Sequence, residues 1–191
     1  MINKKNDIAI GILNGGKSTR MGKDKSLVEY NKKPLAEVIY NKARLFSDEI
    51  YFLGNSPLPD SIDNPIIIQD KPVPGPLSGI LALTEIINKG CLIWAIDMPL
   101  PDIEDVVTIL SLSDNLTKPV IPYNQQLNLY EPLFAYYPYN LLRNIYSMSH
   151  TKTHKSIQSI LNALSIEGDR ELFKKLKNKL KSWNYPIDII L

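Results

Sequence analysis

Cysteine and histidine are scarce in this chain of 191 residues. There is one cysteine, Cys91, and there are two histidines, His150 and His154. A single cysteine excludes an intramolecular disulfide, so we expect a reducing, cytoplasmic setting. The two histidines are four residues apart, but two ligands without a third are weak evidence for a metal site. We interpret both histidines as surface residues.

Long apolar runs and a large charge imbalance are also absent. The first apolar run, at 8–13, is too short for a membrane span or for the core of a secretory signal. The net charge is +2 with 22% charged residues, which gives no reason to expect nucleic acid or a membrane as a partner. Without repeats or a linker, and with 44% hydrophobic residues, the sequence predicts one domain over 1–191, as a monomer.

What the sequence does contain is an alternation of continuous apolar runs and amphipathic stretches. Such alternation predicts an α/β fold of Rossmann-like type, a three-layer sandwich whose mostly parallel sheet has helices on both faces. Residues 118–123 and 131–138 are expected to pair with each other. The predicted strands are 8–13, 49–55, 64–70, 91–96, 118–123 and 131–138, and the predicted helices are 34–46, 77–90, 103–112, 139–147, 155–164 and 169–181.

Polar residues or glycines follow four of the predicted strands. They are Asn14-Gly15-Gly16, Asn55, Asp70 and Asp97. In open parallel sheets, ligands bind outside the carboxyl ends of the strands. We therefore expect these four segments to meet in one crevice.

The segment 11–19, GILNGGKST, fits the phosphate-binding pattern of P-loop NTPases, with Asp97 in the place of their magnesium-binding carboxylate. That pattern needs its first glycine just past a strand and a helix beginning at Lys17-Ser18. Gly11 instead falls inside the apolar run, and no helical periodicity follows Ser18. We favour a strand that ends at Leu13, followed by a glycine-containing loop that closes over a triphosphate. The cations of that loop are Lys17, Arg20, Lys23 and Lys25.

The segment at 13–35, which reads LNGGKSTRMGKDKSLVEYNKKPL, is the first of several blocks that resemble a known family. It is similar to the nucleotide-binding signature of the molybdenum cofactor guanylyltransferases. Three further blocks follow in the same order as in the family. They are Asp70 with GPLSG at 75–79, the strand ending in Asp97-Met98-Pro99, and YEPLFAYYP at 130–138. The tail SWNYPIDI keeps only Asn184, Pro186 and Asp188 of the family's last block. The resemblance covers nearly the whole chain.

The resemblance implies transfer of GMP from GTP to the terminal phosphate of molybdopterin-bound molybdenum cofactor, with release of pyrophosphate. It implies Mg²⁺ held by Asp97, and Lys25, Arg20 and Asp97 as the catalytic residues. It also implies a nucleotide-binding half at 1–100 and an acceptor half at 101–191. The implied nucleotide-binding residues are Leu13, Asn14, Gly15, Gly16, Lys25, Asn55, Asp70 and Asp97, and the implied acceptor-binding residues are Gly75, Pro76, Leu77 and Asn184.

Three other functions remain open at this point. The chain could be a nucleotidyltransferase of the same fold that uses CTP or a sugar phosphate. It could be a non-catalytic GTP-binding partner of cofactor assembly, or a P-loop NTPase. Proteins that deliver the cofactor are further candidate partners, and the basic stretch 170–181 is one surface they could use.

Overall fold

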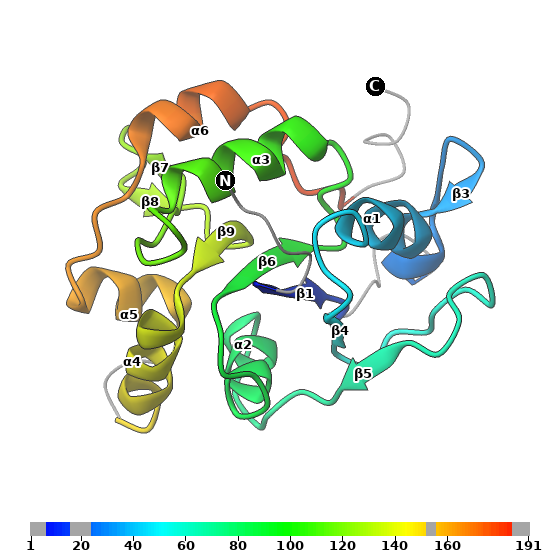
Figure 1. Ribbon diagram of the computed structural model, residues 1–191, viewed down its shortest axis with the longest axis horizontal. Helices are drawn as coiled ribbons and strands as arrows, with labels where there is room; N and C mark the ends of the chain where they lie inside the picture. The colour runs from blue at the N-terminus through cyan, green and yellow to red at the C-terminus, as the bar shows by residue number, and fades with distance from the viewer. Residues whose placement is uncertain (1–6, 16–23, 152–155, 185–191) are drawn as a thin grey trace.

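A five-stranded sheet forms the centre of the protein. The computed structural model describes residues 7–15, 24–151 and 156–184 (Figure 1). The strand order is β5–β4–β1–β6–β9, with the first four strands parallel and β9 antiparallel to β6. The strands are β1 (Ala9–Leu13), β4 (Ile50–Leu53), β5 (Ile66–Ile68), β6 (Cys91–Ala95) and β9 (Phe134–Tyr137).

Helices cover the two faces of this sheet, which confirms the predicted α/β fold of Rossmann-like type. In Figure 1, α1 and α3 lie above the sheet and α2 lies below it. The helices are α1 (Leu35–Ala43), α2 (Leu77–Thr84), α3 (Ile103–Leu112), α4 (Tyr139–Ser149), α5 (Ile157–Ala163) and α6 (Arg170–Leu176). Among the described residues, no helix combines the length and the apolar character needed to cross a bilayer.

The order of the strands places a switch point beside β1. The chain runs outward from β1 to β4 and β5, and then returns to the other side of β1 as β6. Leu13 at the end of β1 is in register with Leu53 of β4 and with Ala95 of β6. The three strands therefore end at one level, and the crevice beyond a switch point is where open α/β sheets bind ligands.

Burial on both faces explains why these strands were predictable. Every residue of β1 and of β6 is buried, so both strands are continuous apolar runs. Gly11 lies in the middle of β1, in register with Tyr51 and Ile93. A Cβ at Gly11 would come within 2.9 Å of side-chain atoms of Leu53 and Leu83. This glycine therefore serves helix–sheet packing, and it is not the strand-following glycine of a P-loop.

The prediction of a strand at 118–123 is wrong. Within it, Val120 makes only an isolated bridge to Tyr136, and β9 pairs as a strand with β6. Pro119 and Pro122 have no N–H to donate, so a ladder cannot continue through this segment. Tyr123 instead begins a separate hairpin of β7 (Tyr123–Asn124) and β8 (Leu129–Tyr130).

Two helices are shorter than predicted, and one hairpin was missed. Helix α2 ends at Thr84 and not near Gly90, and α6 ends at Leu176 and not at 181. Between Asp24 and α1 the chain forms the 3₁₀ turn η1 (Lys25–Leu27) and the hairpin of β2 (Glu29–Tyr30) and β3 (Lys33–Pro34). Asn31 and Lys32 make its turn with φ of 52° and 64°, a conformation suited to two-residue hairpin loops.

Candidate active site

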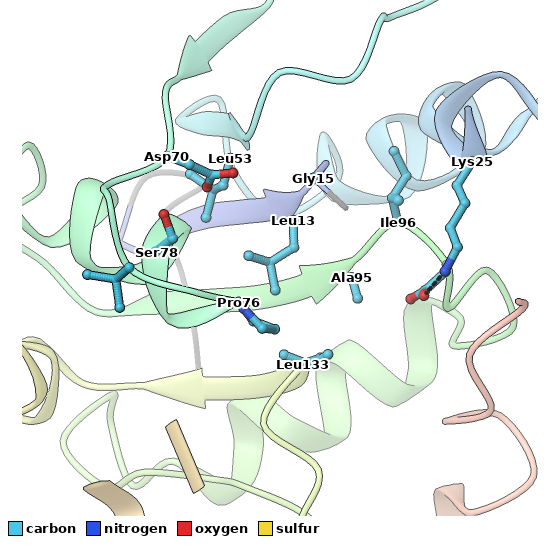
Figure 2. A pocket seen from close by; sticks show the side chains of 13 residues that line it. Leu13, Gly15, Lys25, Leu53, Asp70, Pro76, Ser78, Ala95, Ile96 and Leu133 are labelled. Carbon is cyan, nitrogen blue, oxygen red and sulfur yellow. Dashed lines mark hydrogen bonds and ion pairs between the residues drawn. The ribbon is translucent and has the colours of Figure 1, made fainter. Parts of the chain in front are cut away.

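A cavity of about 340 Å³ opens at the carboxyl ends of β1, β4 and β6 (Figure 2). The strand ends supply Leu13, Leu53 and Ala95 as its floor, and polar side chains come from the connections that follow the strands. The described residues that line it are Leu13, Gly15, Lys25, Leu53, Asp70, Val73, Gly75, Pro76, Ser78, Ala95, Ile96, Asp97 and Leu133. The cavity is thus the predicted crevice at the strand ends.

Lys25, Asp97 and Asn184 form a polar cluster at one side of this cavity. The Lys25 ammonium donates to Asp97 Oδ2 and to Asn184 Oδ1, each at 2.7 Å. In sequence, Lys25 is 72 residues from Asp97 and 159 from Asn184, so only the fold brings them together. The Lys25 and Asp97 side chains are 21% and 17% exposed, and at that burial the ion pair is less screened than a surface pair.

The backbone after β6 is held firmly, and this fixes the Asp97 side chain. Lys42 of α1 donates to the carbonyl oxygens of Pro99 and Pro101 at 2.8 and 2.7 Å. The indole of Trp94 donates to the carbonyl of Met98 at 2.9 Å. Burial lowers the pKa of Lys42, while the carboxylates of Asp102 and Asp105 favour its charged form. A half-buried cation on α1 therefore holds the backbone that follows Asp97.

The C-terminal part of the described chain closes the same side of the cavity. The backbone N–H of Trp183 donates to the carbonyl oxygen of Asp97 at 2.8 Å. The Trp183 side chain is buried and meets the ring of Tyr30 edge to face, with centroids 5.1 Å apart. These contacts place Asn184 against Lys25.

Asp70 enters the cavity after β5, beside Gly15. A Cβ at Gly15 would lie 3.1 Å from Asp70 Oδ2, which is closer than most Cβ contacts. In Figure 2 the Asp70 carboxylate lies on the opposite side of the view from Lys25, the partner of Asp97. An anionic group and a cation-containing cluster thus line one cavity, an arrangement that can hold the two ends of a nucleotide.

The Asp97 carboxylate has the features of a single-residue magnesium ligand. Its Oδ1 is buried and has no hydrogen-bond partner among the described residues, whereas Oδ2 accepts from Lys25. No group of three or more potential ligands exists within the described part of the chain. Mg²⁺ keeps several waters and binds through one or two carboxylates plus substrate phosphates, so Asp97 fits such an ion.

Seven of the predicted site residues line the cavity, and Asn184 lies beside it in contact with Lys25. Asn14 is buried and turned away, with Nδ2 donating to the carbonyl of Ser56 at 2.9 Å. Asn55 is exposed and Leu77 is buried in α2. Gly16 and Arg20, together with Lys17 and His154, lie outside the described residues. The cavity-lining members are Leu13, Gly15, Lys25, Asp70, Gly75, Pro76 and Asp97.

Some lining residues carried no clear signal in the sequence. Leu53 and Ala95 lie near the ends of the predicted strands 49–55 and 91–96, so their position could have been inferred. Leu133 could not, because it depends on the pairing of β9 with β6, where its carbonyl accepts from the Ala95 N–H at 2.8 Å. Ser78 is inside α2, and its hydroxyl donates to the carbonyl of Lys71 at 2.7 Å, which shapes the turn before the helix.

A sheet of this topology, with a cation, a carboxylate and glycines at its switch point, defines a nucleotide-binding α/β protein of the nucleotidyltransferase kind. A family model described as the MobA-like NTP transferase domain matches residues 10–168. The chain belongs to this family.

Related proteins agree with that assignment. A Natranaerobius thermophilus protein described as a "probable molybdenum cofactor guanylyltransferase" is 31% identical over 80% of this chain and 75% of its own. A Pseudomonas putida molybdenum cofactor guanylyltransferase is 27% identical over 84% of this chain and 85% of its own.

Two solved structures share the fold. Molybdopterin-guanine dinucleotide biosynthesis protein A from Archaeoglobus fulgidus superposes with a TM-score of 0.72 at 22% identity, over 96% of this chain and 95% of its own. The 2-C-methyl-D-erythritol 4-phosphate cytidylyltransferase of Thermus thermophilus also reaches 0.72, at 12% identity and with 96% of both chains covered. The fold alone therefore does not determine which nucleotide is used.

Proposed function

We propose that this protein transfers GMP from GTP to the terminal phosphate of molybdopterin-bound molybdenum cofactor and releases pyrophosphate. The observation that carries the proposal is the Lys25–Asp97–Asn184 cluster on the wall of a cavity that Asp70 also lines. The named relatives from N. thermophilus and P. putida point to this reaction among those that the family catalyses.

The reaction needs positioning and charge neutralisation more than a strong base. The attacking phosphate is already an anion, so the enzyme must hold two negatively charged groups together and stabilise the charge that develops at the α-phosphorus. Lys25 lines the wall of the cavity, and we assign its ammonium to the phosphate oxygens. We assign Arg20, outside the described residues, to the departing pyrophosphate.

Mg²⁺ would neutralise phosphate charge and orient the triphosphate when bound. Asp97 would hold it through Oδ1, the oxygen that has no hydrogen-bond partner in the described chain. Oδ2 meanwhile keeps Lys25 beside the same site. The rigid turn at Pro99 and Pro101 keeps the carboxylate from turning away.

We assign recognition of guanine to Asp70. A carboxylate can accept both from the ring N–H and from the exocyclic amino group of guanine, whereas cytosine offers only its amino group. The absence of a side chain at Gly15 leaves space for this carboxylate. Residues 1–100 then supply most of the nucleotide site, and residues 101–191 contribute to the acceptor side, with Gly75, Pro76 and Leu77 at the boundary.

The nucleotide preference tests this proposal. We expect GTP with Mg²⁺ to raise the thermal unfolding midpoint of the full chain, and CTP to have a much smaller effect. Asp70→Asn should reduce that difference, since an amide cannot accept from both N–H groups of guanine. Protection by CTP and not by GTP would instead indicate the cytidylyltransferase alternative.

Pyrophosphate release tests the chemistry itself. With GTP, Mg²⁺ and molybdopterin-bound cofactor, we expect one pyrophosphate for each guanine dinucleotide formed. Binding of GTP without pyrophosphate release in the presence of the acceptor would indicate a non-catalytic partner of cofactor assembly. Release of the γ-phosphate would indicate that the protein is a P-loop NTPase.

A further inference from the structure

A second cavity of about 550 Å³ adjoins the first one. The two share Gly75, Pro76 and Leu133 as a common wall. The start of α5, with Ser156 and Ile157, forms part of the rest. A molecule that reacts with a nucleotide in the first cavity can therefore extend into the second.

The second cavity is mostly apolar, with Glu131, Ser156, Gln158 and Ser182 as its polar lining residues. Prolines, leucines and single methionine and isoleucine residues make up most of its lining, and such walls suit the faces of a flat ring. Glu131 is the one ionisable residue among the described residues that line it. It follows β8 directly, and its backbone N–H donates to the carbonyl of Pro122 at 2.8 Å, which fixes its position.

None of the described residues neutralises Glu131. Its side chain is half-buried, and its carboxylate makes no hydrogen bond or ion pair with a residue in the described ranges 7–15, 24–151 and 156–184. Burial raises the pKa of Glu131, and no cation of the described chain acts in the opposite direction. A partly desolvated carboxylate without a partner costs free energy, so a ligand that supplied N–H donors would be favoured there.

Two polar residues of this cavity are already engaged. Both ends of the Gln158 amide are used by the backbone of Tyr130, which donates to Oε1 at 3.1 Å and accepts from Nε2 at 2.5 Å. The Ser156 hydroxyl accepts from the Ser159 N–H as the cap of α5. Among the described lining residues, Glu131 is the one that offers two charged acceptor oxygens to a ligand.

We propose that the Glu131 carboxylate binds the 2-amino-4-oxopyrimidine edge of the acceptor's pterin ring and so selects the acceptor. This inference rests on the proposed function. The edge presents a ring N–H next to an exocyclic amino group, and the two oxygens of a carboxylate can accept from both. The acceptor's phosphate is repelled by Glu131 and is thereby directed toward the cluster that contains Lys25.

The kinetic test uses Glu131→Gln in the full chain, with GTP, Mg²⁺ and molybdopterin-bound cofactor. We expect the KM for the acceptor to rise at least about tenfold, because the glutamine amide presents one donor where two acceptors are needed. GTP binding, kcat at saturating acceptor and the thermal midpoint should stay near those of the wild type. The matched control is Glu167→Gln, at an exposed carboxylate on the link between α5 and α6, which should leave all these quantities unchanged. An unchanged acceptor KM in Glu131→Gln overturns the inference and leaves the proposed function standing.

A binding test separates the inference from the transfer reaction. The probes are 2-aminopteridin-4-one and pteridine-2,4-dione, which lacks the amino donor, each titrated into the GTP-loaded chain and followed by ring fluorescence. The wild type should prefer the amino compound, and Glu131→Gln should lose that preference. This result supports the inference even if the wild type transfers no GMP. Equal behaviour of the two probes with the wild type, or the same preference in both chains, contradicts it.

Discussion

At the scale of single residues, the site depends on pairs that are remote in sequence. The pairing of Lys25 with Asp97 is the feature on which the proposed chemistry depends. The motif around Lys25 identified the residue, and the strand end identified Asp97. The contact between them, and the third contact from Asn184, required the fold, since no local pattern specifies a hydrogen bond across 159 residues.

The first prediction compares two lysines. Lys25→Ala should lower kcat for pyrophosphate release by roughly 10²- to 10³-fold, the usual effect of losing one donor to a developing charge. Lys17→Ala should have the smaller effect, because Lys17 has no direct role in the transfer reaction that we propose. Lys33→Ala is the matched control. This lysine is exposed on the β2–β3 hairpin, and it pairs with Glu37 of α1. The opposite ranking of Lys17 and Lys25, with γ-phosphate release, would favour a P-loop enzyme.

At the scale of elements, charge holds α6 against the start of α3. Lys179, just after α6, donates to Asp102 and Asp105 at 2.7 Å each. Asp102 is the N-cap of α3 and accepts from the Asp105 N–H at 3.1 Å. The hydrogen bond from Lys179 is the main reason that the pKa of Asp102 falls to about 2.

The pH dependence of stability tests this link. Because the pKa of Asp102 is lower in the folded state, its ionised form contributes stability above the unfolded pKa of about 3.9. That contribution should be lost as the pH falls from about 4 to 2. Denaturant titrations should show a weaker decrease over this window in Asp102→Asn, which keeps a capping side chain but cannot ionise. An identical decrease in the variant would show that Asp102 is not responsible.

The success of sequence prediction also differs between elements. The central strands β1 and β6 were recognisable because burial on both faces makes them apolar runs, and α3 was recognisable because Asp102 caps it. The segment 118–123 has the apolar composition of a strand, but Pro119 and Pro122 have no N–H to donate to a sheet. The prediction of a strand there was therefore wrong. The β2–β3 hairpin was missed because Asn31-Lys32 lacks the glycine that usually marks such a turn.

At the scale of the whole molecule, the topology determines where the chemistry occurs. The reversal of strand order beside β1 brings Leu13, Leu53 and Ala95 to one level, and the connections that follow carry Asp70 and Asp97. The position of this first cavity could be inferred from the strand ends in the sequence. The second cavity could not, since it depends on how the connection between β8 and β9 and the start of α5 pack against Pro76.

A crystal structure with Mg²⁺ and a non-hydrolysable GTP analogue would show whether Asp97 and Lys25 hold the metal ion and the phosphates. We expect Asp97 Oδ1 at about 2.1 Å from the metal ion, Lys25 Nζ within hydrogen-bond distance of phosphate oxygens, and guanine beside Asp70. A complex in which Lys17 opens a helix onto the β- and γ-phosphates, while Lys25 stays away from the nucleotide, would contradict the proposed function.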